Sequence, residues 1–177
     1  GSGGMIAAAY LKPEVVREIF GDARSVVASG PSFGRADAVE GGYRVSGAWA
    51  FASGSKHATW LAEHCLVYEA DGTPRLYPDG TPFERTMLFR KPGATFTDIW
   101  RVMGLKGTGS DKYAVDGLFV PADYSYTREW AEDRRETGTL YRFSNYQMFG
   151  VGFAGVALGI AAATLERPCG VCYHAAD

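Results

Sequence analysis

The stretch that decides the fold is Gly41 to Gly54, GGYRVSGAWAFASG. Bulky side chains alternate along it with small or polar ones, a pattern that predicts a β-strand with one bulky face and one nearly bare face. The bulky face holds Tyr43, Val45, Trp49 and Phe51, and the other face holds Arg44, Ser46, Ala48, Ala50 and Ala52. Gly41-Gly42 is predicted to form a hairpin-type connection into this strand. The strand is expected to end at Ser53-Gly54-Ser55, where small residues expose backbone N–H groups.

Two interpretations of the bare face are open at this point. Its three alanines let a flat molecule approach the backbone, so a planar ligand with hydrogen-bonding groups would fit there. Alternatively, the alanines pack beneath a neighbouring helix and are purely structural, and composition alone favours this second interpretation.

Length, charge and cysteine content restrict the class of protein. A chain of 177 residues fits one domain, or one domain with an appendage. A net charge of −2 gives no basic surface for nucleic acid and no polybasic segment for a membrane. Three cysteines do not make a disulfide framework, so we expect a reducing, cytoplasmic location.

The chain divides into six predicted segments. Residues 1–4 resemble a remnant of cloning, with Met5 as the natural start and no signal-peptide pattern after it. Residues 5–24 contain a short helix, with Pro13 in its first turn and Gly21 as a left-handed stop. In residues 25–127, short apolar runs recur between turn signals, which predicts a mainly β domain, an antiparallel sandwich or barrel with flanking helices.

The C-terminal part is predicted to hold one long apolar helix. Residues 128–143 read as a charged connector, and residues 144–165 as a helix that opens with a capping box, Ser144 to Gln147. The apolar run is shorter than the ~20 residues that a membrane span needs, so a buried helix is expected and no membrane contact. Residues 166–177 form an unrelated tail.

This tail contains Cys169, Cys172 and His174. A structural zinc site needs four ligands, and only three candidate side chains cluster here. We therefore predict no metal site, and the role of Cys169 and Cys172 stays undecided.

Two motifs carry a resemblance to a known family. The first is Trp-x-Phe-x-Ser-Gly from Trp49, followed by a polar run that ends at Trp60, and the second is WRVMGLKGTGSDKYAVDGLFVP from Trp100 to Pro121. In this order they resemble the middle β domain of the acyl-CoA dehydrogenase superfamily. More narrowly, the chain is similar from Val26 to Leu165 to the two-component flavin-dependent monooxygenases.

The resemblance implies a flavin site. FAD or FMN would lie across the organising strand, with its ring beside Trp49, Phe51, Ala52 and Ser53 and with Ala28, Ser29 and Gly30 facing it. Without a flavin, Ser29 would simply cap a turn. Similarly, Gly107 to Ser110 could be a phosphate cradle, but glycines required by a tight turn are the favoured interpretation because no helix follows.

The resemblance also implies partners and limits. A separate flavin reductase would supply reduced flavin, and the apolar helix would form a dimer interface. Family members are roughly twice as long, so the chain resembles a truncated relative that lacks the catalytic helical bundle. No catalytic residue is assigned, and His57 is only a weak candidate for a catalytic role.

Two functions remain open from the sequence. The first is a flavin-dependent oxidoreductase, or a truncated relative that keeps the flavin-binding β domain. The alternative is a non-catalytic oligomerising or binding module derived from that fold. The substrate, the choice between FAD and FMN, and a second polypeptide that would complete the site are not fixed by the sequence.

Overall fold

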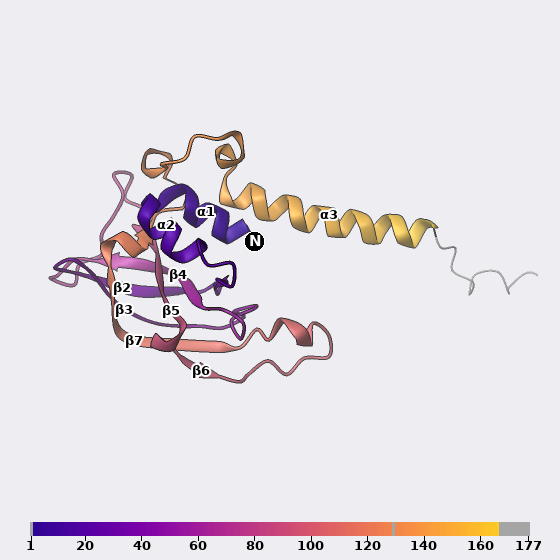
Figure 1. The fold of residues 1–177 in the computed structure, drawn as a ribbon, viewed down its shortest axis with the longest axis horizontal. Helices are drawn as coiled ribbons and strands as arrows, with labels where there is room; N and C mark the ends of the chain where they lie inside the picture. The colour runs from indigo at the N-terminus through magenta and orange to yellow at the C-terminus, as the bar shows by residue number, and fades with distance from the viewer. Residues whose placement is uncertain (1, 129, 167–177) are drawn as a thin grey trace, which may run out of the picture.

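The centre of the molecule is one mixed sheet of eight strands, seen in a computed structural model that describes residues 2–128 and 130–166 (Figure 1). The strands are β1 (Val27–Ala28), β2 (Phe33–Val39), β3 (Gly42–Trp49), β4 (Trp60–Tyr68), β5 (Glu84–Arg90), β6 (Thr95–Thr97), β7 (Lys112–Pro121) and β8 (Ser125–Tyr126). Their order is β6-β7-β3-β2-β4-β5-β8, with β1 beside β4. The prediction of a mainly β fold with flanking helices is confirmed.

The strand pairing is antiparallel except where β4 pairs with β1 and with β2. β2 and β3 form the expected hairpin, whose turn contains Gly41 with a φ of 77°. β4 then returns beside β2, parallel to it, and β1 also pairs with β4 in parallel. β7 pairs with the other edge of β3. The outer edge of β2 therefore remains open, and β4 pairs with it.

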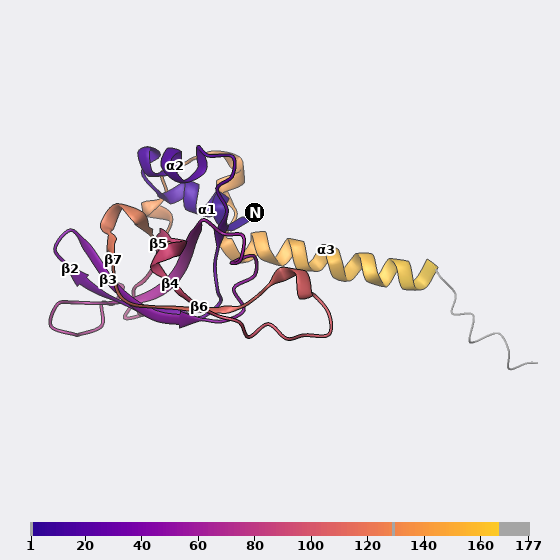
Figure 2. The same ribbon diagram turned by 60° about the horizontal axis from the view of Figure 1, so that its bottom comes forward.

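Two short helices cover one face of the sheet (Figure 2). They are α1 (Ser2–Tyr10) and α2 (Pro13–Phe20), and they pack against the outer side of β4 and β5. Pro13 occupies the first turn of α2 as predicted. Gly21 ends this helix in a right-handed conformation, with a φ of −72°, so the predicted left-handed stop is wrong; its N–H bonds instead to the carbonyl of Arg17.

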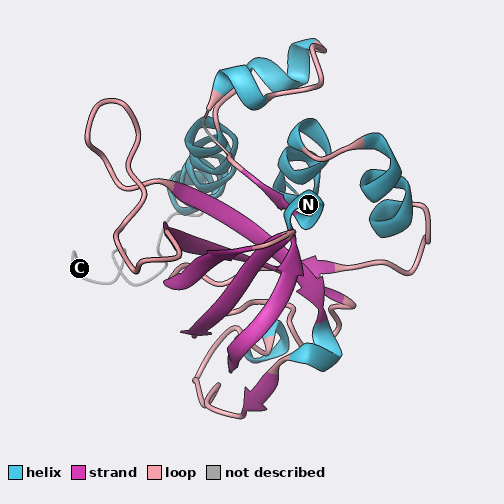
Figure 3. Cartoon of the chain, turned by 90° about the vertical axis from the view of Figure 1, so that its left-hand side faces the viewer, coloured by secondary structure: helices cyan, strands magenta, loops and turns pink. Residues whose placement is uncertain are grey.

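A second core fills the opposite side of the sheet. It is built from residues of β2, β3, β4, β5 and β7, among them Val45, Trp49, Leu61, Met87 and Tyr113. Figure 3 shows the strongly twisted strands that enclose it. The predicted bulky face of β3 is therefore its core face for Tyr43, Val45 and Trp49, which are all buried.

The alternation on β3 does not continue to Phe51. The strand ends at Trp49, and Phe51 adopts a left-handed backbone with a φ of 57°. As a result Phe51 is 63% exposed, whereas Ala52 turns into the core and is fully buried. The prediction that Phe51 shares the bulky face and Ala52 the bare face is wrong, because the strand ends at Trp49 and does not continue to Ser53.

Single turns of 3-10 helix lie between the strands and within the connector. They are η1 (Lys91–Gly93), η2 (Lys106–Thr108), η3 (Ala122–Tyr124), η4 (Ala131–Asp133) and η5 (Thr139–Arg142). Helix α1 includes Ser2 to Gly4, residues that the sequence marked as a cloning remnant, and their origin stays a prediction. Residues 167–177, with Cys169, Cys172 and His174, lie outside the described residues.

Helix α3 (Asn145–Glu166) projects away from the β domain (Figure 1). Its capping box has the predicted geometry: Ser144 accepts a bond from the Gln147 N–H at 3.1 Å, and Gln147 accepts one from the Ser144 N–H at 2.8 Å. Apart from its contact with α1, the helix is uncovered, so the expected burial is not met within this chain. By length and composition alone, Tyr146–Glu166 could cross a membrane.

Candidate functional site

The fold brings the two sequence motifs into contact. The loop that follows β3 lies against the loop that precedes β7, and the Gly54 N–H donates to the carbonyl of Thr108 at 2.8 Å. The Ala52 N–H donates to the carbonyl of Asp111 at 3.3 Å. We call residues 50–56 the first loop and residues 98–111 the second loop.

An ion pair locks these loops together. Lys56 of the first loop lies 3.0 Å from the carboxylate of Asp111, which also accepts the N–H groups of Ile99 and Trp100. The hydrogen bond from Lys56 holds the pKa of Asp111 below its usual value. Asp111 therefore stays ionised and fixes the second loop against the first.

Three hydroxyl groups form a chain between the loops. Ser53 lies 2.8 Å from Ser110, and Ser110 lies 2.7 Å from Thr108. The Thr108 hydroxyl donates its own hydrogen to the carbonyl of Leu105 at 2.9 Å. Because each hydroxyl has one hydrogen, Ser110 must donate to Thr108 and Ser53 to Ser110. The exposed Ser53 oxygen consequently presents acceptor lone pairs to the outside.

Backbone strain is concentrated in the same loops. Among the described residues, the two non-glycine residues with positive φ are Phe51 in the first loop and Leu105 in the second. The Phe51 ring meets the Trp100 ring edge to face, with centroids 6.0 Å apart. Strain of this kind persists where the surrounding structure imposes it and is common at functional sites.

Trp49 supports the site from beneath. Its side chain has no exposed surface and packs against Phe89 and Tyr113, with ring centroids 6.5 Å and 5.9 Å away. A Cβ added at Gly34 would lie 2.3 Å from the indole ring, and one at Gly47 would lie 2.7 Å from it. These glycines therefore make room for the indole, which presents no surface to a ligand in this conformation.

The Ser29–Gly30 turn reaches the same tryptophan. A Cβ at Gly30 would lie 2.8 Å from the Cβ of Trp49 and 3.2 Å from the carbonyl oxygen of Ala50, so this turn packs closely against the chain at the end of β3. The Gly30 N–H donates to the carboxyl of Glu63, at 2.9 Å and 3.2 Å from its two oxygens. Glu63 is fully buried, and burial raises its pKa well above the usual value. A neutral carboxyl therefore holds the turn in place.

A small cavity of about 110 Å³ opens beside Ser29. Its walls come from α1, β1, β4, β8 and the start of α3, and they include Ala28, His64, Arg128 and Phe149. His64 lies 2.9 Å from the hydroxyl of Thr86, and burial lowers its pKa to about 4. The imidazole is thus neutral near pH 7 and acts as a hydrogen-bonding group rather than a charge.

Known proteins with this fold are flavoenzymes. No protein-family model matches the chain. A pigment production hydroxylase of Rhodococcus erythropolis is 30% identical over 94% of the chain. Oxygenase subunit HsaA, a flavin-dependent monooxygenase of Rhodococcus jostii, is 38% identical over 50% of it. The structure of XiaF from Streptomyces, in complex with FADH2 and glycerol, matches 75% of the chain with a TM-score of 0.62 and 28% identity. The chain is similar to flavin-dependent monooxygenases and shares their acyl-CoA dehydrogenase-like fold.

The chain corresponds to only part of each of these monooxygenases. The chain spans 42% of the Rhodococcus erythropolis hydroxylase, 21% of HsaA and 32% of XiaF. The match to the Rhodococcus erythropolis hydroxylase covers 94% of the chain and therefore includes both sequence motifs. A single helix of this length and composition, such as α3, is not by itself evidence for a membrane protein.

In this monooxygenase-type fold the predicted site residues occupy three positions. Ser29, Phe51 and Ser53 reach the surface, whereas Trp49 and Ala52 lie in the core, and Ala28 and Gly30 are buried in the turn above it. Their roles toward a flavin remain predictions. His57 is exposed, and its backbone N–H bonds to the carbonyl of Gly54.

Sequence reasoning missed Glu63 and His64. The sequence did contain a signal for Glu63. Along β4 it alternates with the same period of two as Leu61, Cys65 and Val67, whose side chains point inward. A carboxyl at an inward position of a strand needs a buried partner. The partner, the N–H of Gly30, cannot be recognised until β1, β2 and β4 are seen to pair.

Proposed function

We propose that the chain is the flavin-binding part of an oxygenase component that hydroxylates an aromatic compound. FAD or FMN would lie against the first and second loops, near Phe51, Ser53 and the Ser29–Gly30 turn. Two findings support this placement: the similarity to flavin-dependent monooxygenases, and the junction of the two motifs at the hydroxyl chain. XiaF was solved with FADH2, and a relative from Rhizobium is called an FADH(2)-dependent resorcinol hydroxylase.

The outward lone pairs of Ser53 carry the proposal. The hydrogen of Ser53 is committed to Ser110, so a ligand on this surface would have to donate a hydrogen to the Ser53 oxygen. A reduced flavin carries a hydrogen on N5, whereas N5 of an oxidised flavin is only an acceptor. The geometry thus favours the reduced form.

Each residue near Ser53 has a distinct part in this scheme. A bound reduced flavin would supply the electrons with which O2 is activated for hydroxylation. Phe51 offers an exposed ring beside Trp100, and Glu63 keeps the Ser29–Gly30 turn against the end of β3. The small cavity beside Ser29 would hold part of the substrate, with neutral His64 in its wall.

A separate reductase is the proposed partner. The Rhizobium relative and a p-hydroxyphenylacetate hydroxylase from Acinetobacter are each named as an oxygenase component. In such systems reduced flavin comes from a second protein. The exposed Ser53 hydroxyl accepts a hydrogen bond and does not donate one. It therefore suits a flavin that arrives in the reduced form, with a hydrogen on N5.

The test is an anaerobic titration with reduced FAD and reduced FMN, repeated with the oxidised forms. We expect saturable binding that is tighter for reduced flavin, and Ser53→Ala should weaken it by up to about tenfold, the value of one hydrogen bond. Ser25→Ala, which alters a half-buried hydroxyl outside both loops, is the matched control. Equal affinity for both redox forms would contradict the role of Ser53, and no saturable binding would overturn the flavin proposal.

A second proposal concerns assembly, and the uncovered surface of α3 favours it. We propose that two copies dimerise through this helix. Gly155 and Gly159 are four positions apart on one face, and a Cβ at either would meet nothing within 4 Å in this chain. Small residues at this spacing allow two helices to approach closely.

Light scattering tests the dimer. The wild-type chain should have twice its monomer mass. Gly155→Leu should yield a monomer, because the new side chain blocks close approach without any clash inside the chain. Ala157→Leu, on the opposite side of the helix, should remain dimeric. A monodisperse wild-type monomer would refute this proposal and leave the flavin proposal untouched.

A further inference from the structure

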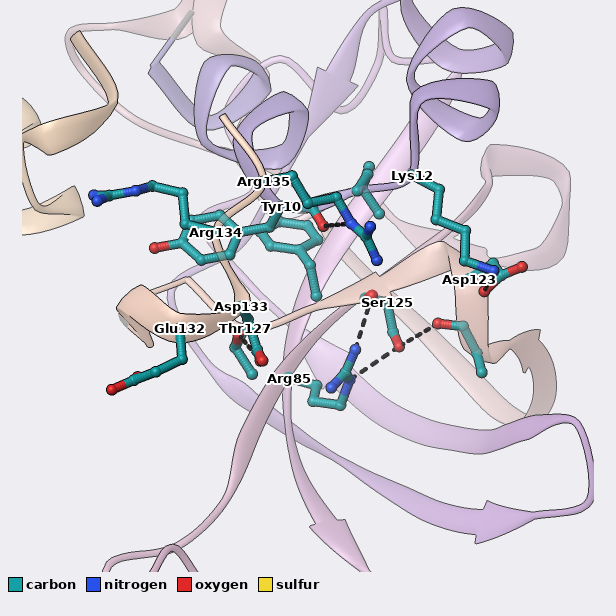
Figure 4. A pocket seen from close by; sticks show the side chains of 13 residues that line it. Tyr10, Lys12, Arg85, Asp123, Ser125, Thr127, Glu132, Asp133, Arg134 and Arg135 are labelled. Atoms are coloured by element: carbon teal, nitrogen blue, oxygen red, sulfur yellow. Dashed lines mark hydrogen bonds and ion pairs between the residues drawn. The ribbon is translucent and has the colours of Figure 1, made fainter. Parts of the chain in front are cut away.

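A second, polar cavity of about 360 Å³ lies away from the proposed flavin loops. Its walls come from the junction of α1 and α2, from β5, from the segment 122–127 and from the connector at 132–135 (Figure 4). None of its lining residues belongs to the first loop, the second loop or the Ser29–Gly30 turn. Its function is therefore argued independently of flavin binding.

Arg135 is held in place on one wall. Its backbone N–H donates to the carbonyl of Ala9 at 2.8 Å, and its Nε donates to the carbonyl of Tyr10 at 3.2 Å. Both carbonyls lie at the C-terminal end of α1, where they have no partner within the helix. These bonds leave both Nη groups of Arg135 free to bind a ligand.

Arg85 is held in the same way on the opposite wall. Its Nε donates to the Ser125 hydroxyl and its Nη2 to the Ser125 carbonyl, each at 3.0 Å. Ser125 is fixed in turn by its bond to the carbonyl of Ala122 at 2.7 Å. Figure 4 shows Arg135 extending from the connector toward the wall that carries Arg85 and Ser125. Both guanidinium groups are thus ordered before any ligand binds.

Neither guanidinium group has a counter-ion. Among the described residues, no carboxylate lies within ion-pair distance of Arg85 or Arg135. Lys12 at the rim is neutralised by Asp123 at 2.8 Å, and Arg134 donates to the carbonyl of Tyr141. The connector contributes two acidic groups to the wall, Glu132 and Asp133, and Asp133 accepts the Thr127 hydroxyl at 2.6 Å.

We propose that this cavity binds the oxyanion group, a phosphate or a carboxylate, of a small molecule. A guanidinium group matches both anions because its N–H donors form a planar fork. Two such groups, fixed on facing walls, lose little side-chain entropy on binding. The volume exceeds that of a bare ion, so the cavity has room for the organic part of the ligand.

Asp133 makes the proposal testable in both directions. Its carboxylate repels an anion, and Asp133→Asn removes this repulsion while keeping an acceptor for Thr127. Asp133→Asn should therefore tighten binding, whereas Arg135→Gln should weaken it by about tenfold, as expected for the loss of a charged hydrogen-bond partner. Exposed Arg24, which pairs with Asp22 outside the cavity and outside both loops, gives the matched control Arg24→Gln.

The experiment is a calorimetric titration of the full chain with inorganic phosphate, and separately with malonate, at constant ionic strength set by chloride. Saturable binding of either anion that weakens in Arg135→Gln, strengthens in Asp133→Asn and is unchanged in Arg24→Gln would support the proposal, and the better anion identifies the ligand group. Because Arg85 supports Ser125, Arg85→Lys provides a milder second variant and should also bind more weakly. No binding beyond chloride, or equal loss in Arg24→Gln, would overturn the proposal.

Discussion

Strand β3 and helix α3 are both rich in apolar residues, yet they lie in opposite environments. Trp49 of β3 has no exposed surface and sits among aromatic rings of neighbouring strands. On α3, Phe153 is 76% exposed and Leu165 is 84% exposed. An apolar sequence thus specifies that an element has to be covered, but it does not say whether the cover comes from the same chain.

The largest expected effect separates these two regions by stability. Trp49→Ala would empty a fully buried site and should lower the free energy of unfolding by about 3–5 kcal/mol. Phe153→Ala removes a side chain that is exposed in the monomer and should change it by less than about 0.5 kcal/mol. Urea unfolding at low protein concentration measures both variants. A large loss in Phe153→Ala would mean that α3 is covered even in the monomer.

Glu63 offers a second test, because it extends the β core to the Ser29–Gly30 turn. Glu63→Leu leaves the buried Gly30 N–H without an acceptor and should lower stability by about 1–3 kcal/mol. Glu63→Gln keeps an acceptor and should be much closer to wild type. If both variants lost the same stability, the hydrogen bond to Gly30 would not be the source of the stabilisation by Glu63.

The pH dependence of stability follows from the same buried groups. The pKa of Glu63 is raised in the folded state, so its stabilising effect is complete below the unfolded pKa and is lost as pH rises through the folded pKa. The pKa of His64 is lowered to about 4, so its effect is present above the unfolded value near 6.5 and is lost as pH falls toward 4.

These opposite signs can be separated by measuring unfolding across pH. His64 is present in both proteins, so a decline of wild-type stability with rising pH above about 4.5 that Glu63→Gln lacks would report Glu63. Cys65, which lies near Glu63 and whose pKa is raised to about 12, and Tyr126, whose pKa is also raised to about 12, keep their protons in the folded state. Identical pH profiles for wild type and Glu63→Gln would contradict the assignment.

The smallest expected effect concerns the start of α3. Ser144→Ala removes one of the two capping-box bonds and should cost about 1 kcal/mol of helix stability. Because α3 has few contacts with the β domain, the loss should appear as fraying in circular dichroism and leave β-domain unfolding unchanged. Coupled loss of both signals would show that the two regions unfold together.

Local signals predicted much of the fold. The Gly41 hairpin, the buried residues of β3 and the Ser144 capping box each depend on neighbours in sequence, and the structure confirms them. The parallel pairing of β2 with β4 was not predicted, because strand periodicity carries no information about which edge is free. Phe51 was misplaced because its left-handed backbone interrupts the alternation.

The candidate site was predicted less completely than the fold. The motifs indicated the two loops, but the hydroxyl chain from Ser53 to Thr108 appears only when these loops meet. Glu63 was missed because its partner, Gly30, is 33 positions away in sequence. Contacts of this kind are set by topology and are not visible in residue spacing.

The pairing of β3 with β7 also has a consequence for synthesis of the chain on the ribosome. Ser46 and Asp116, which bond across these strands, are 70 positions apart in sequence. The hairpins β2–β3 and β4–β5 can form early from local contacts, but the long edge of β3 stays open until β7 has emerged. An open edge of this kind can pair with other chains, so this interval is when the nascent protein is most exposed to aggregation.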